Sequence, residues 1–288
     1  MITLKYGKRS IVSSLLSLVL LFTLAYVFTP PAFAEGADGF LLNPVSGELV
    51  PSDPVPTDIP TVAPGLHYIG GRLVFGDKDG VPAESIGVDT SFYNGMPDWE
   101  ELKEIGVDFA YIRVGGRGWG NGALYTDEWF LNSIRNAQAA GIKTGVYFYS
   151  MAANRGEAKR EALYVIEKLD GLPLDLPVYF DMEFSGDYPE GRTDGLTNAQ
   201  RVDFALEFCR TIEHSDYSAG IYASESFFHD ELNMDALSDY PFWVASYNDT
   251  YTRPISGDYT IWQFTDSAFL PGISGYCDVN VMYPLPEK

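Results

Sequence analysis

The stretch of sequence that decides the fold is Leu176-Pro177-Val178-Tyr179-Phe180-Asp181-Met182-Glu183-Phe184. Successive side chains of a β-strand point to opposite faces. One face therefore holds only apolar residues, namely Val178, Phe180, Met182 and Phe184. The other face holds Tyr179, Asp181 and Glu183. An apolar back predicts a strand covered by helices, and a polar-tipped front predicts that the strand borders a cleft, as an inner strand of a barrel does.

Asp181 and Glu183 are the first candidates for chemistry. They are two residues apart on one face, so their Cα atoms are expected roughly 6.5–7 Å apart. Two carboxyl groups at that range are suited to acid–base or electrostatic work on a glycosidic bond. A surface Asp and Glu beside a strand would give the same local pattern, so the choice depends on the rest of the chain.

The composition is that of a large, acidic, aromatic-rich chain. It has 288 residues, of which 46% are hydrophobic and 15% aromatic, and its formal net charge is −21. The length allows one large domain or two ordinary ones. Such a negative charge argues against binding nucleic acid through its phosphates. The aromatic excess suits stacking on sugars, although most rings are expected in the core.

Cysteine and histidine are few. The two cysteines and three histidines show no metal-ligand spacing, and there is no G-x-S-x-G, P-loop or G-x-G-x-x-G motif, so we expect no metal or cofactor. Export would permit a disulfide between Cys209 and Cys277. We favour two buried thiols, because Cys209 lies in a helix-like run and Cys277 lies just before the last predicted strand.

The first 34 residues have the layout of a signal peptide. Three basic residues among the first nine precede an uncharged apolar run over 11–27 and the small-residue site Ala32-Phe33-Ala34. We expect cleavage after Ala34, and hence a secreted or cell-wall-associated protein. The alternative is an uncleaved membrane anchor, because the apolar run is long for a signal peptide. Residues 35–65, rich in Pro, Gly and acidic residues, are predicted to form a flexible linker.

A short β-hairpin segment is predicted at 66–85, with its turn at Gly70-Gly71. It weakly resembles one unit of the aromatic-glycine repeats that bind bacterial wall polymers. A single unit lacks the neighbours that such repeats need, so we favour a plain packed hairpin.

From residue 86 to the end, strand-like and helix-like segments alternate. The predicted strands are 86–91, 109–115, 144–150, 176–184, 219–224, 242–247, 260–264 and 278–282. The predicted helices are 99–105, 126–140 with Thr126 as N-cap, 155–169, one that starts at the capping box Thr197-Asn198-Ala199-Gln200, and 230–237. Five strand–helix units followed by β-rich connections predict an α/β barrel that is parallel at first and irregular near its end.

Polar residues gather at or near the ends of these strands. Asp89 lies on the first, Tyr149 ends the third, Tyr222 lies on the fifth, and Asp278 begins the last. Active sites of α/β barrels lie at the carboxyl ends of the strands, where Asp181 and Glu183 also fall. Each residue alone would pass for a helix cap or a core tyrosine, and it is their convergence that makes them candidates.

With these strands and candidate residues in order, the chain resembles glycoside hydrolase family 25, the lysozymes that cleave after N-acetylmuramic acid. The similar segments are Gly87-Val88-Asp89-Thr90-Ser91 with Asp98-Trp99, the strand to Ile112-Arg113, Gly145-Val146-Tyr147, Asp181-Met182-Glu183, Trp262-Gln263-Phe264 and Asp278-Val279-Asn280. They run in family order over about 86–284. The departures are Thr90 for the usual Val, Phe264 for Tyr, and Asn94 where Gln is common, and none removes a carboxyl group.

The resemblance implies an irregular (β/α) barrel of about eight strands with fewer helices, in a domain over 86–288. It implies a 1,4-β-N-acetylmuramidase that cuts between N-acetylmuramic acid and N-acetylglucosamine. By position, Glu183 is the general acid, and Asp181 orients the substrate's acetamido group or positions water. Asp89 and Asp278 flank the sugar, and Tyr149, Tyr222 and Tyr247 are further candidates for sugar contact. The expected partner is the glycan strand of peptidoglycan, bound by a monomer.

The mechanism stays open between two routes. Four carboxyl groups around one pocket cannot all ionise cheaply, so one keeps its proton near neutral pH, and Glu183 is the candidate because it lies nearer the mouth. We favour a substrate-assisted route over an inverting one, since the substrate carries an N-acetyl group. The alternative functions are a chitinase-like N-acetylglucosaminidase and a non-catalytic cell-wall-binding or spacer protein. The chitinase pattern Asp-x-x-Asp-x-Asp-x-Glu fails here at Leu176 and Tyr179.

Overall fold

The computed structural model describes residues 40–42, 49–51, 65–69, 71–76, 83–184, 191–248, 254 and 259–283. The predicted signal peptide, most of the predicted linker and Gly70 of the predicted turn lie outside these residues. Within the described part of the chain, no helix is long and apolar enough to cross a membrane.

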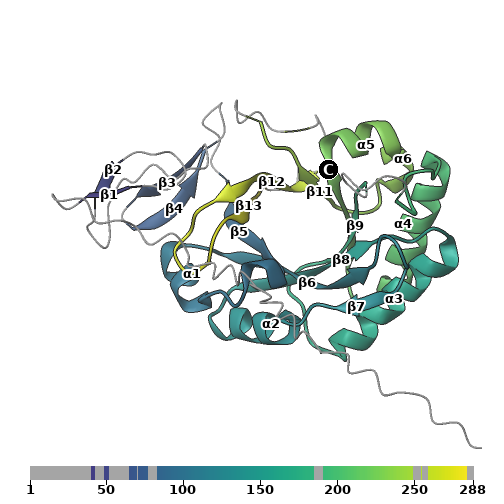
Figure 1. The fold of residues 1–288 in the computed structure, drawn as a ribbon, viewed down its shortest axis with the longest axis horizontal. Coiled ribbons are helices and arrows are strands. Elements are labelled where there is room, and N and C mark those ends of the chain that lie inside the picture. Colours follow the sequence, from purple (N-terminus) through teal and green to yellow (C-terminus); the bar gives the residue numbers. More distant parts are fainter. Residues whose placement is uncertain are drawn as a thin grey trace, which may run out of the picture. The chain divides into compact units, whose positions relative to one another are not determined.

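Eight strands close into a barrel (Figure 1). In ring order they are β5 (Ser85–Thr90), β6 (Phe109–Arg117), β8 (Lys143–Ser150), β9 (Val178–Met182), β10 (Ala219–Ser224), β11 (Phe242–Ala245), β12 (Tyr259–Ala268) and β13 (Cys277–Met282), and β13 pairs with β5. The pairings are parallel from β5 through β12 and antiparallel for β12–β13 and β13–β5. A short strand, β7 (Leu124–Thr126), pairs with the far end of β6. The expected irregular (β/α) barrel is confirmed.

The helices lie outside the ring of strands (Figure 1). They are α1 (Trp99–Ile105), α2 (Phe130–Ala139), α3 (Arg155–Leu169), α4 (Asn198–Glu213), α5 (Glu225–Glu231) and α6 (Met234–Leu237), with a 3₁₀ turn at Phe92–Asn94. Local sequence fixes several of their starts. Asn154 caps α3 by accepting from the Glu157 N–H, and Thr197 and Gln200 form the predicted capping box of α4.

Two predicted helices were wrong in their extent. The helix expected over 126–140 begins only at Phe130, because Thr126 ends strand β7. The next residue, Asp127, accepts from the backbone N–H groups of Phe92 and Trp129 and pairs with Arg113, so its carboxyl group is not available as a first-turn residue. The helix expected over 230–237 is two helices, because Ser224 and Asn233 each cap a separate start.

The strand alternation read from the sequence is the organising feature of the core. On β9, Val178, Phe180 and Met182 face the main core, which lies between the strands and the helices. Tyr179 faces the barrel interior, and Asp181 continues that face into a cleft. The interior is filled by a second, largely aromatic cluster of Phe109, Tyr111, Tyr179, Tyr222, Trp243, Ala245 and Ile261. One strand face therefore stabilises the fold and the other shapes the interior.

Glycines make room for three of the interior rings. Gly87, Gly145 and Gly220 stand in register opposite Phe109, Tyr111 and Tyr179 on the neighbouring strands. A Cβ added at any of the three would lie 2.3–2.5 Å from a ring carbon of that aromatic partner. Each ring thus lies across the backbone of a glycine, which lets large aromatic residues fill the barrel without expanding it.

The segment before the barrel shares the main core. Strands β3 (Leu66–Ile69) and β4 (Arg72–Phe75) form the expected hairpin, and Phe75 packs with its ring centroid 5.7 Å from Trp262 and 4.5 Å from Phe264. A packed hairpin is therefore confirmed. Within the predicted linker, Phe40–Leu42 (β1) and Leu49–Pro51 (β2) pair as short antiparallel strands that its composition did not predict. Cys209 and Cys277 are both buried and unpaired in the described structure, as favoured.

Candidate active site

All seven candidate residues lie at the carboxyl ends of the parallel barrel strands or beside them. Six line one cleft of about 440 Å³: Asp89, Tyr149, Asp181, Glu183, Tyr222 and Asp278. Tyr247 lines a neighbouring cavity of about 550 Å³ instead. The register brings them together, because Asp278 stands opposite Asp89, and Asp181 stands between Tyr149 on β8 and Tyr222 on β10. The convergence expected from the sequence is what the fold produces.

Asp89 lies at the deep side of the cleft and is only 4% exposed. Its Oδ2 accepts from Gln263 Nε2 at 2.7 Å and from Asn280 Nδ2 at 2.8 Å. Burial raises the pKa of Asp89, while the hydrogen bonds from Asn280, Gln263 and Asp278 oppose that rise. Asp89 is thus the carboxyl group of the cleft that is best supplied with donors, which favours its charged form.

Asp278 is half-buried and hydrogen-bonds to Asp89. Burial raises its pKa to about 9, and the negative charges of Asp89, Asp266 and Glu183 add to the rise. Of two hydrogen-bonded carboxyl groups, the one with fewer donors keeps the shared proton. These contacts therefore favour a proton on Asp278 rather than on Asp89.

Asp181 and Glu183 form the second pair. Asp181 is 3% exposed, and its buried Oδ1 has no hydrogen-bond partner within the described structure. Burial, followed by the charge of Glu183, raises the pKa of Asp181 well above its usual range. Glu183 is an exposed residue at the mouth of the cleft, but its carboxyl group is turned among the cleft walls, so desolvation raises its pKa, while the hydrogen bond that it accepts from Asp181 opposes the rise. The opposite effects of their shared hydrogen bond on the two pKa values favour the proton on Asp181, whereas the sequence argument placed it on Glu183.

Aromatic rings form the floor and the walls. Trp243 is 1% exposed at the floor. Its ring centroid lies 4.6 Å from that of Tyr222 and 5.9 Å from that of Tyr147. The exposed rings of Tyr93, Trp119 and Tyr125 line the same cleft. Flat apolar rings beside hydrogen-bonding carboxyl groups match a sugar, which has apolar faces and hydroxyl edges.

Two cavities meet at the acid pair. Glu183 and Tyr222 line both the cleft and the neighbouring cavity, whose other walls come from Phe184, Ser224, Glu225, Ser226, Phe227, Ala245, Ser246 and Tyr247. A chain of sugars that occupied both cavities would therefore pass beside Glu183 where it crosses from one to the other. That is where a proton donor to a bond between two sugars has to lie.

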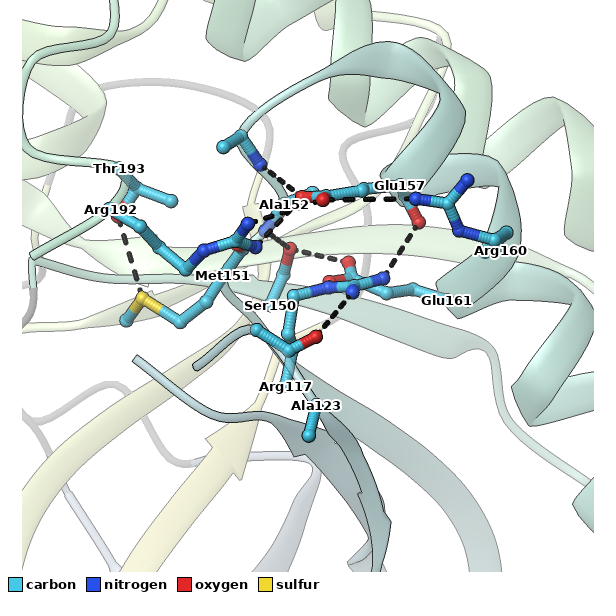
Figure 2. A network of polar contacts seen from close by, with 12 residues as sticks. Arg117, Ala123, Ser150, Met151, Ala152, Glu157, Arg160, Glu161, Arg192 and Thr193 are labelled. Atoms are coloured by element: carbon cyan, nitrogen blue, oxygen red, sulfur yellow. Dashed lines mark hydrogen bonds and ion pairs between the residues drawn. The ribbon is translucent and has the colours of Figure 1, made fainter. Parts of the chain in front are cut away.

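Buried ion pairs hold the wall of the cleft in place (Figure 2). Arg117, at the end of β6, lines the cleft and pairs with Glu161 of α3 at 2.6 Å, and both are almost fully buried. Ser150, at the end of β8, donates to the other oxygen of Glu161 at 2.6 Å. Arg117 also donates to the Gly122 carbonyl group at 2.7 Å, which fixes the turn that carries Trp119.

A second ion pair lies one helical turn earlier on α3. Glu157 accepts from Arg192 at 2.7 Å and from the Ala153 N–H at 2.9 Å, and Arg192 also donates to the Met151 carbonyl group (Figure 2). A Cβ on Gly122 would lie 2.9 Å from the guanidinium carbon of Arg192, so the two ion pairs meet at that glycine. Three loops that follow β6, β8 and β9 are thereby tied to one helix.

Sequence reasoning missed several residues of the site. Gln263 and Asn280 belonged to quoted motifs but received no role, and Trp243, Arg117 and Trp119 were not considered. A signal existed for the first two. Each is a polar residue flanked on both sides by apolar ones, Trp262 with Phe264 and Val279 with Val281, so each is the inward residue of its strand. Within the described residues, no group of His, Cys, Asp and Glu is arranged to hold a metal ion.

Comparisons with known proteins agree with this geometry. The family model of glycosyl hydrolases family 25 matches residues 88–273. The chain is 28% identical to the autolytic lysozyme of Clostridium acetobutylicum, over 67% of this chain and 54% of that protein. It is 28% identical to lysozyme M1 of Streptomyces globisporus, over 76% of this chain and 78% of that protein.

Solved structures support the fold. The modular autolysin LytC of Streptococcus pneumoniae, in complex with a synthetic peptidoglycan ligand, superposes with a TM-score of 0.64 at 22% identity, over 85% of this chain and 61% of that chain. The chain thus spans little more than half of the autolytic lysozyme and less than two thirds of LytC. The family model covers most of this chain and includes Asp89, Asp181 and Glu183. On that match, the chain belongs to glycosyl hydrolases family 25.

Proposed function

We propose that this chain is an exported muramidase that hydrolyses the β-1,4 bond between N-acetylmuramic acid and N-acetylglucosamine in peptidoglycan. The observation that carries the proposal is the place of Glu183. It is the exposed acid at the junction of two cavities, with the buried Asp181 beside it on the same strand face. The printed names of two relatives, both lysozymes, and the peptidoglycan ligand of LytC agree with that substrate class.

Glu183 is the general acid in this proposal. A glycan that spans both cavities brings its glycosidic oxygen beside this carboxyl group, which protonates the oxygen as the bond to the sugar carbon breaks. Proton donation to the leaving group typically contributes about 10²–10⁴-fold to the rate.

Asp181 provides the second function. Asp181 lines the cleft, and its Oδ1, which has no hydrogen-bond partner within the described structure, is available to accept from the N–H of a substrate acetamido group. A carboxyl group that accepts this bond favours its ionised form, so substrate binding moves the shared proton from Asp181 to Glu183. Glu183 therefore carries the proton only when a sugar is bound. The ionised Asp181 holds the acetamido group for attack on the sugar carbon, which is the substrate-assisted route.

Export is the second part of the proposal. The basic start, apolar run and Ala32-Phe33-Ala34 site of the sequence support a signal peptide that is cleaved after Ala34. Peptidoglycan lies outside the cell membrane, so a hydrolase of this substrate has to reach that side. N-terminal sequencing of the protein from a secreting host checks the cleavage, and a start at Glu35 is expected.

The reaction is tested by mass spectrometry of peptidoglycan fragments after digestion. Muramic acid at the new reducing ends is expected, with no such ends in a digest by Glu183→Gln. Glucosamine at the new reducing ends would instead assign a glucosaminidase. Binding to the wall without any new reducing ends would assign a wall-binding protein.

A further inference from the structure

Two amide side chains converge on one oxygen of Asp89. Gln263 Nε2 and Asn280 Nδ2 both donate to Asp89 Oδ2, at 2.7 and 2.8 Å. The amides come from β12 and β13, and they are 2% and 0% exposed. A carboxyl oxygen that accepts two N–H bonds away from water is stabilised as an ion.

The indole of Trp243 fixes the direction of the Asn280 amide. Gln263 Oε1 accepts from the hydroxyl groups of Tyr222 at 2.9 Å and Tyr247 at 2.6 Å. Asn280 Oδ1 accepts from the indole N–H of Trp243 at 2.8 Å. An indole nitrogen can only donate, and an amide oxygen can only accept. The NH₂ end of Asn280 therefore has to face Asp89. Tyrosine hydroxyl groups can donate or accept, so for Gln263 it is the carboxylate of Asp89, which can only accept, that selects the NH₂ end.

The groups around Asp278 are unlike those around Asp89. Asp278 stands directly opposite Asp89 on β13 and hydrogen-bonds to it. Asp278 interacts electrostatically with six titratable groups: Asp89 on β5, Asp266 on β12, Glu183 after β9, Tyr147 on β8, Tyr247 after β11, and Cys277 beside it. None of these is a cation, so the only gain open to Asp278 is to share a proton with Asp89.

We propose that Gln263 and Asn280 are positioning residues that fix the single negative charge of the Asp89–Asp278 pair on Asp89. Asp278 then meets the substrate as a neutral carboxyl group. The charge state follows from the contacts alone, and its consequence for catalysis rests on the proposed function. The charge of Asp89 already makes Glu183 hold its proton more tightly. A second full charge on Asp278 would strengthen that effect and weaken Glu183 as an acid.

The first test measures the charge state without any substrate. The variants Gln263→Glu and Asn280→Asp keep the shape of each side chain and replace its N–H donor by an oxygen. Carboxyl ¹³C chemical shifts of the aspartates are followed against pH in the full chain. In the native protein Asp89 is expected to titrate below Asp278. Each variant is expected to raise the titration of Asp89 by about one pH unit, the order of one lost charge-assisted hydrogen bond.

The matched control is Thr265→Val. Thr265 lies two residues beyond Gln263, is equally buried, and hydrogen-bonds only to Ser267 within the described structure. It should leave both titrations in place. An Asp278 that is ionised at pH 7 in the native protein, or an Asp89 titration that is unmoved in both variants, would overturn the proposal. If a variant fails to fold, Asn280→Ala removes the same donor without adding a carboxyl group.

The second readout is the pH profile of kcat/KM on wall fragments. If activity needs an ionised Asp89, kcat/KM falls at low pH as Asp89 takes up a proton. This acid limb of the profile should therefore move to higher pH in Gln263→Glu and Asn280→Asp, but not in Thr265→Val. A merely structural role would lower the rate without moving the limb. If the chain proves inactive on peptidoglycan, the proposed function fails while the ¹³C titration still decides the charge state.

Discussion

Two groups of carboxyl groups, one on helix α3 and one in the cleft, have opposite surroundings. On α3, Glu161 and Glu157 each face a guanidinium group, at 2.6 and 2.7 Å. In the cleft, Asp89, Asp181, Glu183 and Asp278 face one another and amides, and in the described part of the chain none of them forms an ion pair with Lys or Arg. Arg113, whose charge reaches Asp181, is paired with Asp127 instead.

The difference separates carboxyl groups that hold the fold from those that carry chemistry. On α3, the ion pairs and hydrogen bonds with arginine oppose the effect of burial: the pKa of Glu157 falls below its ordinary value, although burial still raises that of Glu161 to about 7. The carboxyl groups of the cleft have no such cation beside them and all have raised pKa values, so they hold and exchange protons near neutral pH. We name the two clusters by whether their carboxyl groups form ion pairs with arginine. The paired cluster is Glu157, Glu161, Arg117 and Arg192, and the unpaired cluster is Asp89, Asp181, Glu183 and Asp278.

The largest effect on activity is expected in the unpaired cluster. Glu183→Gln should lower kcat on wall fragments by about 10²–10⁴-fold, because the leaving group then receives no proton. The melting temperature should stay close to that of the native protein, since the side chain is exposed and similar in shape. A turbidity assay and a thermal melt check both. Near-normal lysis by Glu183→Gln would remove this residue from the mechanism.

The largest effect on stability is expected in the paired cluster. Glu161→Ala should cost about 3–5 kcal/mol of the free energy of unfolding, because Arg117 then stays buried without its partner. Denaturation by urea measures the loss. Glu161→Gln keeps the hydrogen-bonding shape and should cost less. Equal stability of Glu161→Ala and the native protein would refute the structural role assigned to this cluster.

The dependence of stability on pH should run in opposite directions for Asp278 of the unpaired cluster and Glu157 of the paired cluster. The folded pKa of Asp278, about 9, lies above its ordinary value of 3.8. The stability that this group contributes is therefore fully present below pH 3.8 and is lost as pH rises through 9. Asp278→Asn cannot ionise, so its melting temperature should exceed that of the native protein at pH 9 and approach it near pH 4. Each kcal/mol recovered corresponds to about 2–4 °C.

Glu157 should respond the other way. Although burial alone would raise its pKa, the hydrogen bond from Arg192 lowers the pKa below the ordinary value of 4.5. Its contribution is therefore present above pH 4.5 and is lost as pH falls through the lower, folded pKa. In thermal melts, Glu157→Gln should lose more stability at pH 6 than at pH 3. A loss that is the same at both values would contradict the pairing.

The smallest effect is expected for an ion pair on the same helix that faces water. Lys168 and Glu167 approach to 2.8 Å, but their side chains are 30% and 68% exposed. Water already solvates both charges, so Glu167→Ala should leave the melting temperature unchanged. This variant is the matched control for Glu161→Ala. A clear loss here would mean that burial is not what distinguishes the two pairs.

Much of the barrel could be predicted from local patterns. The strand-like segments predicted from the sequence overlap all eight barrel strands, and α1 and α3 have the predicted bounds because their caps and apolar spacing are local features. The errors came where long-range contacts decide. Thr126 resembles an N-cap, but pairing of β7 with β6 makes it the end of a strand. The helix expected at 230–237 divides where Asn233 starts a second helix.

The candidate site divides in the same way. The sequence by itself determined which acids share a strand face and, through the order of motifs, that Asp89, Asp181, Glu183 and Asp278 belong to one cleft. Only the tertiary structure decided their protons. Gln263 and Asn280 reach Asp89 from more than 170 positions away in the chain. The charge of a buried carboxyl group depends on such donors and on neighbouring charges, which closure of the barrel brings together and which no local spacing contains.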